Sequence, residues 1–295
     1  MTSVDSQVGP QRVSTEYVDT QGLRPVGGRP SLPTYIARLW RRRAFIIADS
    51  RAKSASSNKD YLLGNLWLIG KPLLDGLTYF VIFGIVFGAR DGIDNFVGFL
   101  LIGIFLFGYT SRSLTSGLSA IPGGKNLIRT FAFPRAVIPL AGTLRETLST
   151  FPVILTMFVL ILAIPPHAEV TAWWLLFPVV FVLQSLFNTG LSLYAARFGA
   201  LIPDAKMAVS FVSRIWMYGS GVMFSIEKIS DGHPVVMAIS KLNPLYCVLE
   251  ISRDLLLYAE PGDLTLWIVL CAWAVITPLL GFVFFWHGEE HYGRE

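Results

Sequence analysis

The chain has 295 residues, of which 53% are hydrophobic and only 15% are charged. A soluble domain averages about 25% charged residues, so the composition excludes an ordinary soluble protein and indicates lipid as the main solvent. The net charge of +4 does not indicate nucleic-acid binding, because many of the 24 Lys and Arg residues precede residue 66 or flank apolar segments, as the positive-inside rule describes.

Residues 1–33 are rich in Gly, Pro, Ser, Thr and Gln and lack the apolar core of a signal peptide, so we expect a disordered cytosolic tail. Residues 34–48 combine Trp40 and aliphatic side chains with four arginines, Arg38, Arg41, Arg42 and Arg43. This segment is too short and too charged to cross a bilayer. It predicts an interfacial amphipathic helix whose arginines reach lipid phosphates. The polar segment Asp49–Asp60 is predicted to be a linker.

The rest of the chain contains apolar runs long enough to cross a membrane as helices, which takes about 20 residues. They lack the alternation of membrane strands. Because backbone polar groups must be satisfied within lipid, the sequence predicts an all-α, polytopic bundle. Six transmembrane helices are predicted, at approximately 66–88, 96–118, 137–164, 172–196, 207–225 and 265–286, followed by a polar tail at 287–295.

Residues 226–263 do not fit a simple span. Their apolar run, Val235–Glu250, is interrupted by Lys241 and by Asn243-Pro244, and a short amphipathic piece, Leu249–Tyr258, follows. Apolar runs of about 10–14 residues are more often re-entrant or interfacial than spanning. We therefore expect a pair of re-entrant helices on the outer side of the membrane, before the last span.

The distribution of cations predicts the orientation. With six spans, the N-terminus, the 119–136 loop, the 197–206 loop and the C-terminal tail share one side, and the first three are rich in Lys and Arg. The short opposite loops carry only Arg90, and 226–263 has more carboxylates than cations. The sequence thus predicts a multi-pass plasma-membrane protein with both termini in the cytosol.

The loop between the second and third predicted spans mixes cations with large apolar side chains. It reads Lys125-Asn-Leu-Ile-Arg-Thr-Phe-Ala-Phe-Pro-Arg135 and continues directly into Ala136-Val-Ile-Pro-Leu140. A cationic, apolar segment held beside a membrane either rests on lipid headgroups or binds a partner protein. The residues alone leave both alternatives open.

No motif for an enzyme or motor is present in the sequence. Gly123-Gly-Lys125-Asn126 lacks the spacing and the terminal hydroxyl of a phosphate-binding loop. His287 and His291 lie four residues apart in the C-terminal tail without the pattern of a zinc site, and Cys247 and Cys271 have apolar neighbours typical of packing residues. We expect no catalytic residue, metal or cofactor in this chain.

Ionisable residues within predicted spans are candidates for the substrate path, because desolvating them is costly. Asp75, Arg145 and Arg214 fall in this group, and cations near the cytosolic mouth would attract a phosphate-bearing substrate. Tyr79 and Tyr109 lie deep enough to stack on sugar rings. Snorkelling, structural ion pairing and ordinary helix packing are the alternative roles of these five residues.

Three ordered motifs resemble the polysaccharide-export permeases of ABC-2 type transporters, of the Wzm and TagG kind. The first is Tyr61-Leu-Leu-Gly64-Asn-Leu-Trp67…Lys71-Pro72-Leu73-Leu74, at the start of the first span. The second is Asn126-Leu-Ile-Arg129…Phe133-Pro134-Arg135…Ile138-Pro139-Leu140. The third is Leu242-Asn243-Pro244-Leu245, with Arg253 downstream. The similarity covers about residues 34–287.

This resemblance implies a division of labour. Two copies of such a permease form a channel, and two separate nucleotide-binding subunits, which carry ATP and Mg, bind the cytosolic face. The 119–136 loop would be the coupling segment, with its contacts at Leu127, Ile128, Arg129, Phe131, Phe133, Pro134 and Arg135. Residues 34–48 would be the gate helix. The substrate would be a glycan on a polyprenyl pyrophosphate carrier, and the chain looks most similar to lipid-linked galactan exporters, with O-antigen or teichoic-acid export as near alternatives.

Three other functions compete with this interpretation. An ABC-2 permease for a drug or lipid would share most of these features. A secondary transporter would require repeated halves with intramembrane carboxylates, and no such repeat is apparent. A membrane glycosyltransferase would require a cluster of catalytic carboxylates at a loop, and none stands out.

Overall fold

The structure is a computed structural model that describes residues 30–56, 66–82, 93, 95–130, 133–229, 234–290 and 292. Every regular element within these ranges is helical, as the sequence predicted. In chain order the helices are α1 (Leu32–Arg41), α2 (Arg43–Ser56), α3 (Leu66–Tyr79), α4 (Phe96–Gly123), α5 (Lys125–Thr130), α6 (Val137–Ala163), α7 (Phe177–Leu201), α8 (Ala205–Gly219), α9 (Ile226–Ile229), α10 (Pro234–Leu242), α11 (Pro244–Arg253) and α12 (Leu264–His287). A 3-10 turn, Ala172–Leu176, precedes α7, and a π-helical turn, Asp254–Tyr258, follows α11.

Four of the described helices are long and apolar enough to cross a membrane: α4, α6, α7 with its preceding turn, and α12. They coincide with the second, third, fourth and sixth predicted spans. The first and fifth spans correspond to α3 and α8, which have 14 and 15 residues. Helices of this length reach only about 21–23 Å, against roughly 30 Å of hydrocarbon. Residues 83–88 of the first span lie outside the described residues, so the count of six spans stays a prediction.

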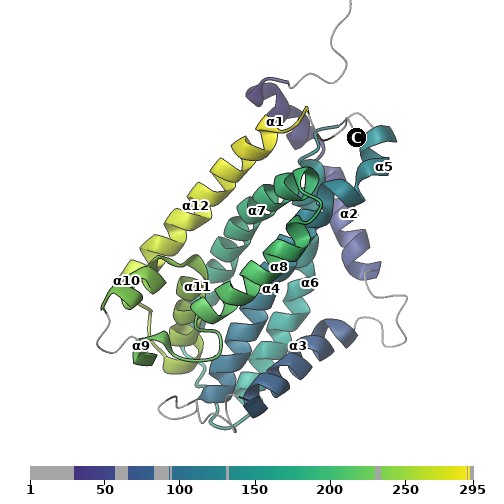
Figure 1. Cartoon of the computed structure of the whole chain (residues 1–295). Helices are drawn as coiled ribbons and strands as arrows, with labels where there is room; N and C mark the ends of the chain where they lie inside the picture. The colour runs from purple at the N-terminus through teal and green to yellow at the C-terminus, as the bar shows by residue number, and fades with distance from the viewer. Residues whose placement is uncertain are drawn as a thin grey trace, which may run out of the picture.

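The long helix α4 forms the centre of the bundle, with α6, α7, α8 and α11 around it (Figure 1). Its most apolar window is 72% buried within this single chain. Helix α7 packs between α4 and α12, and at its contact with α12 the backbones touch. A Cβ on Gly190 would lie 2.3 Å from the backbone nitrogen of Pro278, and one on Gly281 would lie 2.6 Å from the carbonyl oxygen of Gly190. Small residues allow such close packing where lipid supplies no hydrophobic driving force between helices.

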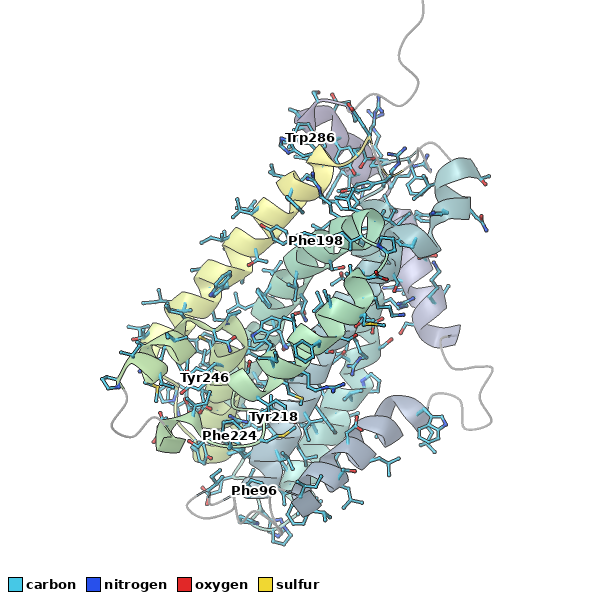
Figure 2. All side chains as sticks on the ribbon, viewed as in Figure 1. Phe96, Phe198, Tyr218, Phe224, Tyr246 and Trp286 are labelled. Carbon is cyan, nitrogen blue, oxygen red and sulfur yellow. The ribbon has the colours of Figure 1, made fainter. Side chains whose placement is uncertain are left out.

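The bundle has two distinct ends. Helices α1 and α5 and the last turn of α12 lie at one end, and α9 and α10 lie towards the other (Figure 1). Figure 2 marks the two ends by Trp286 and Phe96. We call them the α5 end and the α10 end. The first described residues and the end of α12 thus share the α5 end, as the predicted topology requires, while their cytosolic location stays a prediction.

The predicted re-entrant segment contains a sharp break between two helices. The α10 axis and the axis of α11 with its π-helical turn meet at 93°, the geometry of a re-entrant loop or a broken span. Asn243 fixes the break, because its Oδ1 accepts hydrogen bonds from Leu245 N (3.1 Å) and from Trp216 Nε1 (2.9 Å). Its Nδ2 donates to Ser220 Oγ at 2.9 Å. Asn243 therefore fastens the break to α8 and the turn that follows it.

Arg253 fastens the other end of α11 to the core and is 0% exposed. Its guanidinium donates to Glu250 Oε1 at 2.7 Å and to the carbonyl oxygen of Gly221 at 2.9 Å. It also stacks on Phe99 of α4, with Cζ 3.3 Å from the ring centroid. A buried arginine needs such a set of partners, because an uncompensated buried charge is strongly destabilising.

The prediction of a linker from residue 49 onward was wrong for the described residues, because α2 continues to Ser56. An ion pair between Lys53 and Asp49 (2.9 Å) spans one helical turn. Ser50 is fully buried, and its hydroxyl donates to the carbonyl oxygen of Ala141 on α6 at 2.8 Å. Packing against α6 thus extends a polar helix that composition alone did not favour. Residues 57–60, 89–92 and 94, predicted as linker and loop, lie outside the described residues, as do most of the predicted N-terminal tail and part of the predicted C-terminal tail.

The predicted gate segment contains α1 and the start of α2, separated at Arg42. Trp40 is 68% exposed, and its ring lies 5.1 Å from Arg43 Cζ, a cation–π arrangement. The other arginines of the segment are also exposed, namely Arg38, Arg41 and Arg42. Tyr35 points the other way and is 1% exposed. The segment therefore has one cationic, aromatic face and one packed face, while its position at a lipid interface stays a prediction.

Candidate functional site

Helix α5 contains the first of the predicted coupling residues, Leu127, Ile128 and Arg129, and lies beyond the end of α4 (Figure 1). The bend between them is at Gly124, whose amide donates to the carbonyl oxygen of Ala120 at 3.0 Å. A Cβ on Gly124 would lie 2.9 Å from the carbonyl oxygen of Ala120 and 2.8 Å from Ile138 Cδ1, so a larger residue would crowd the backbone at this bend. Close packing at this glycine fixes the direction in which α5 leaves the bundle.

The structure divides the predicted coupling residues into two groups. Leu127 is half-buried beside a cavity, whereas Ile128 packs against the core cluster that includes Tyr35 and Phe285. Phe133 packs on α2, with 6.4 Å between its ring centroid and that of Phe45. Pro134 is buried. The side chain of Arg129 and the whole of Phe131 lie outside the described residues.

Arg135 belongs to the group that fastens the loop to the bundle. Its backbone amide donates to Glu289 Oε1 at 3.0 Å, and its guanidinium donates to the carbonyl oxygen of Glu289. Glu289 follows α12 and is only 7% exposed. Its second carboxylate oxygen accepts a hydrogen bond of 2.8 Å from the Tyr35 hydroxyl, which in turn accepts one of 3.0 Å from the amide of Ala136. We call this set of contacts the Tyr35–Glu289–Arg135 link.

Burial controls the ionisation of this link. Burial raises the pKa of the Tyr35 hydroxyl, so it remains protonated at neutral pH and can donate. Burial also raises the pKa of the Glu289 carboxyl, while the hydrogen bonds from Arg135 and Tyr35 and the charge of Arg135 oppose this effect. The link joins α1, the loop after α5 and the end of α12, three segments far apart in the sequence.

Beside α5 lies a polar cavity of about 1120 Å³ between α2, α4 and α6. Its polar lining residues are Asp49, Lys53, Ser111, Arg112, Thr115, Ser116, Ser119, Asn126, Arg145, Glu146 and Ser149. Leu127 and Gly124 border it, so a movement of α5 changes the shape of the cavity. Pockets that hold drug-sized ligands measure about 300–1,000 Å³, so this one has room for a substantial headgroup.

The residues predicted for the substrate path do not gather at one place. Arg145 lines the cavity, whereas Asp75 on α3 and Arg214 on α8 are exposed and do not line it. Tyr109 is fully buried, with its hydroxyl 2.7 Å from Thr147 Oγ1 and 2.9 Å from Ser185 Oγ, so it is a packing residue in this single chain. The side chain of Tyr79 lies outside the described residues.

Arg112 was not predicted as a site residue, although it lies in the middle of α4 and lines the same cavity as Arg145. The signal was available, because an arginine near the middle of a predicted span is costly and therefore a functional candidate. Arg112 lies 3.7 Å from Glu146 (Nε to Oε2), and Arg145 lies 2.9 Å from the same carboxylate (Nη2 to Oε1). One carboxylate on α6 thus faces two guanidinium groups from different helices.

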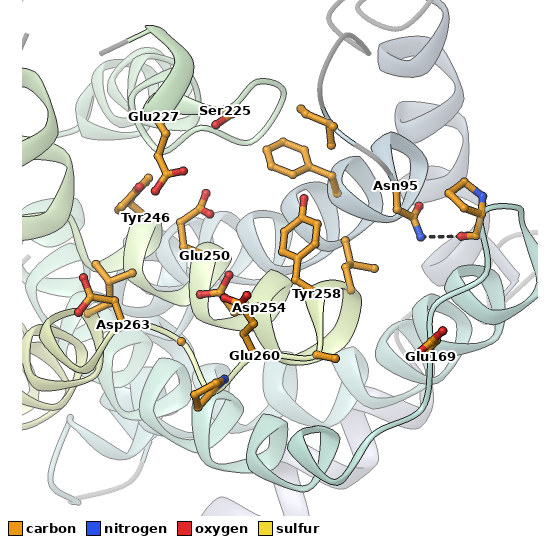
Figure 3. Close-up of a pocket in the computed structure, with 18 of the residues that line it drawn as sticks. Asn95, Glu169, Ser225, Glu227, Tyr246, Glu250, Asp254, Tyr258, Glu260 and Asp263 are labelled. Carbon is orange, nitrogen blue, oxygen red and sulfur yellow. Dashed lines mark hydrogen bonds between the residues drawn. The ribbon is translucent and has the colours of Figure 1, made fainter. Parts of the chain in front are cut away.

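A second pocket, of about 1020 Å³, lies near the α10 end and has an acidic lining (Figure 3). Six carboxylates line it: Glu169, Glu227, Glu250, Asp254, Glu260 and Asp263. Lys241 also lines it and is paired with Asp263 at 2.9 Å. The hydrogen bond from Lys241 lowers the pKa of the Asp263 carboxyl. Within the described residues no group of acidic, His or Cys side chains has the arrangement of a metal site. The two pockets therefore differ in charge.

A helical bundle with four described helices that are long and apolar enough to cross a bilayer is that of an integral membrane protein. The sequence profile described as "ABC-2 type transporter" matches residues 56–257. The chain belongs to this family of transporter permeases.

Two named relatives support the assignment. The O-antigen export system permease protein RfbA of Klebsiella pneumoniae is 28% identical over 200 residues, which cover 67% of this chain and 74% of the relative. The protein of the same name from Myxococcus xanthus is 26% identical over 211 residues, covering 71% of this chain and 79% of the relative. The aligned part is most of the chain in both cases.

Proposed function

We propose that this chain is the membrane subunit of an ATP-driven exporter that moves a polyprenyl-pyrophosphate-linked polysaccharide out across the bacterial plasma membrane. The observation that carries the proposal is the similarity to O-antigen export permeases over most of the chain. An O-antigen type of glycan agrees best with those names, and galactan and teichoic-acid types remain predictions from the sequence motifs.

ATP hydrolysis belongs in this proposal to a separate nucleotide-binding subunit, which carries ATP and Mg. The working unit is two copies of this chain with two such subunits. The position of α5 supports this arrangement, since it lies at one end of the bundle beside the polar cavity. The side chains of Leu127 and Arg129 would bind in a groove of the nucleotide-binding subunit. Ile128, Phe133, Pro134 and Arg135 would hold the segment in position through their contacts with the rest of the chain.

Co-purification tests the coupling assignment. Arg129→Glu and Phe133→Ala are expected to abolish binding of the ATPase subunit, while the permease stays folded in the membrane. Glu169→Lys, an exposed charge reversal near the α10 end, is the matched control and is expected to leave ATPase binding unchanged. If both loop variants retain the ATPase and export normally, the loop is not the coupling segment.

Depletion of the protein tests the substrate class. Cells that lose it are expected to accumulate lipid-linked glycan on the cytosolic side of the membrane, measured by accessibility of the glycan to an enzyme in spheroplasts and in inverted vesicles. An unchanged distribution would rule out glycan export. It would leave a drug or lipid as the cargo of this ABC-2 permease.

A further inference from the structure

The two arginines of the polar cavity share a single carboxylate. Glu146 Oε1 accepts hydrogen bonds from Arg145 Nη2 at 2.9 Å and from Arg145 Nε at 3.3 Å, and its Oε2 lies 3.7 Å from Arg112 Nε. Hydroxyl groups on the neighbouring helices orient the guanidinium groups, because Arg112 donates to Thr150 at 3.2 Å and Arg145 donates to Ser116 at 3.2 Å. We call these three residues the Arg112–Glu146–Arg145 cluster.

The cluster carries one more positive charge than negative charge and has unused donors. Nη1 of Arg112 and Nη1 of Arg145 donate to no residue within the described ranges. A guanidinium presents five donors in a planar fork that matches phosphate oxygens, so two of them with one carboxylate attract a further anion. The other charged residues of the cavity, Lys53 and Asp49, neutralise each other at 2.9 Å.

Stability of the bundle does not explain this arrangement. The side chains of Arg112, Arg145 and Glu146 are 35%, 30% and 13% exposed, and partly exposed ion pairs add little to the stability of the folded state. Neighbouring residues such as Arg145 and Glu146 do not face each other on a helix, so their pairing requires the arginine to fold back. Charges within spanning helices are nevertheless costly, which marks a functional site.

We propose that the Arg112–Glu146–Arg145 cluster is the binding site for the diphosphate of the lipid-linked substrate, and that Glu146 is an internal competitor which the diphosphate displaces. This inference rests on the proposed function and extends it by assigning the residues that recognise the headgroup. A diphosphate carries more charge than a carboxylate and offers more acceptor oxygens, so it bridges both guanidinium groups with bidentate contacts. Glu146 then turns into the cavity, where water solvates it.

The place of the cluster gives this exchange a consequence for transport. Gly124 and Leu127 border the same cavity, so α5 lies beside the bound headgroup. Repulsion from the displaced Glu146 also keeps the diphosphate from binding too tightly to be released. The acidic pocket near the α10 end disfavours an anion there, so the headgroup is not retained at that end.

Binding measurements on the purified full-length permease in nanodiscs test the proposal, with a polyprenyl diphosphate and with inorganic pyrophosphate as separate probes. Arg112→Gln and Arg145→Gln are each expected to weaken binding of the polyprenyl diphosphate about ten-fold or more, since each removes charge-assisted hydrogen bonds. Glu146→Gln has nearly the same shape and removes the competing charge, so it is expected to tighten binding several-fold. Arg51→Gln, on an exposed arginine of α2 outside the cavity, is the control and should leave binding unchanged.

Opposite effects of the arginine and glutamate variants distinguish a binding site from a structural ion cluster. If Glu146→Gln weakens binding as much as Arg112→Gln does, or if both arginine variants bind within two-fold of the native protein, the proposal is wrong. Arg112→Lys keeps the charge without the fork and gives a second test if Arg112→Gln does not fold; binding at native strength in this variant would contradict bidentate recognition.

The two probes identify the source of the phosphate. Tighter binding of the polyprenyl diphosphate than of inorganic pyrophosphate supports a lipid headgroup as the source. A permease that binds inorganic pyrophosphate but not the polyprenyl diphosphate would refute a lipid headgroup. Loss of binding in the arginine variants with normal glycan export would refute only the cluster assignment. An unchanged glycan distribution after depletion of the protein would refute the proposed function itself.

Discussion

Tyr35→Phe tests the Tyr35–Glu289–Arg135 link with the smallest possible change. It keeps the aromatic ring, which packs 5.8 Å from the Phe282 ring, and removes one hydroxyl group. That hydroxyl donates to Glu289 at 2.8 Å and accepts from the amide of Ala136 at 3.0 Å, so the variant leaves a buried carboxylate oxygen and a buried N–H without these partners.

The magnitude follows from the two lost hydrogen bonds. A hydrogen bond to a charged group contributes about 1.5–3 kcal/mol and a neutral one about 0.5–1.5 kcal/mol, so we expect the loop to lose about 2–4.5 kcal/mol of local stability. Each 1.4 kcal/mol corresponds to a ten-fold change in an equilibrium constant. Amide exchange in residues 133–138 is therefore expected to accelerate roughly 30- to 1,600-fold if these amides exchange by local opening.

Hydrogen-exchange mass spectrometry of the full-length protein measures this effect. Residues of α7 serve as an internal reference and should exchange at the native rate. Tyr292→Phe is the matched control, because the Tyr292 hydroxyl donates to the carbonyl oxygen of Phe285 at 3.0 Å in the same cluster, and no hydrogen bond among the described residues joins it to residues 133–138. Exchange in residues 133–138 within two-fold of the native rate in Tyr35→Phe would refute the reasoning, as would equal acceleration in both variants.

Three further predictions concern packing and ionisation. Arg253→Ala is expected to destabilise the protein by about 3–5 kcal/mol, because it leaves Glu250 without its ion-pair partner and empties a buried site. The effect is measured as a lower thermal unfolding temperature. A melting curve like that of the native protein would contradict this role. Gly190→Ala is expected to lower the free energy of unfolding by about 1–3 kcal/mol, or to abolish folding, because the new methyl group forces α7 away from α12. Gly219→Ala, where a Cβ would meet nothing within 4 Å, should be tolerated. Equal effects of the two substitutions would argue against the close contact. Burial raises the pKa of the Glu289 carboxyl above its ordinary value of 4.5, so its contribution to stability is present below pH 4.5 and is lost as the pH rises through the folded-state pKa. Glu289→Gln should remove this part of the pH dependence of the unfolding temperature, and an unchanged profile would count against it.

The sequence predicted the long helices well because their signal is local. An apolar run of the right length, as in α4 or α12, stays helical in lipid whatever its neighbours are. The break between α10 and α11 was also predictable, because Asn243-Pro244 interrupts an apolar run. In each case a short window of sequence contains the physical cause.

The candidate sites depend on contacts that no window of sequence contains. Tyr35 and Glu289 lie 254 positions apart, so nothing local indicates that a tail carboxylate holds the loop after α5. The polar residues of α2 indicated a linker because the burial of Ser50 against α6 is a tertiary effect. Arg112 is a different case. An arginine within an apolar helix is a local signal of a functional site, so the sequence was sufficient to predict it.

The central helix α4 makes contacts along the whole height of the bundle. Near its start, the ring of Phe99 stacks against the guanidinium of Arg253. Near its middle, Arg112 lines the polar cavity. After its last residue, Gly124 connects it to α5. A helix of 28 residues is about 42 Å long and resists compression through its hydrogen bonds, and its one proline, Pro122, lies in its last turn. An axial displacement at α5 is therefore expected to reach the polar cavity and the base of α11 together, because the helix between them moves as one body.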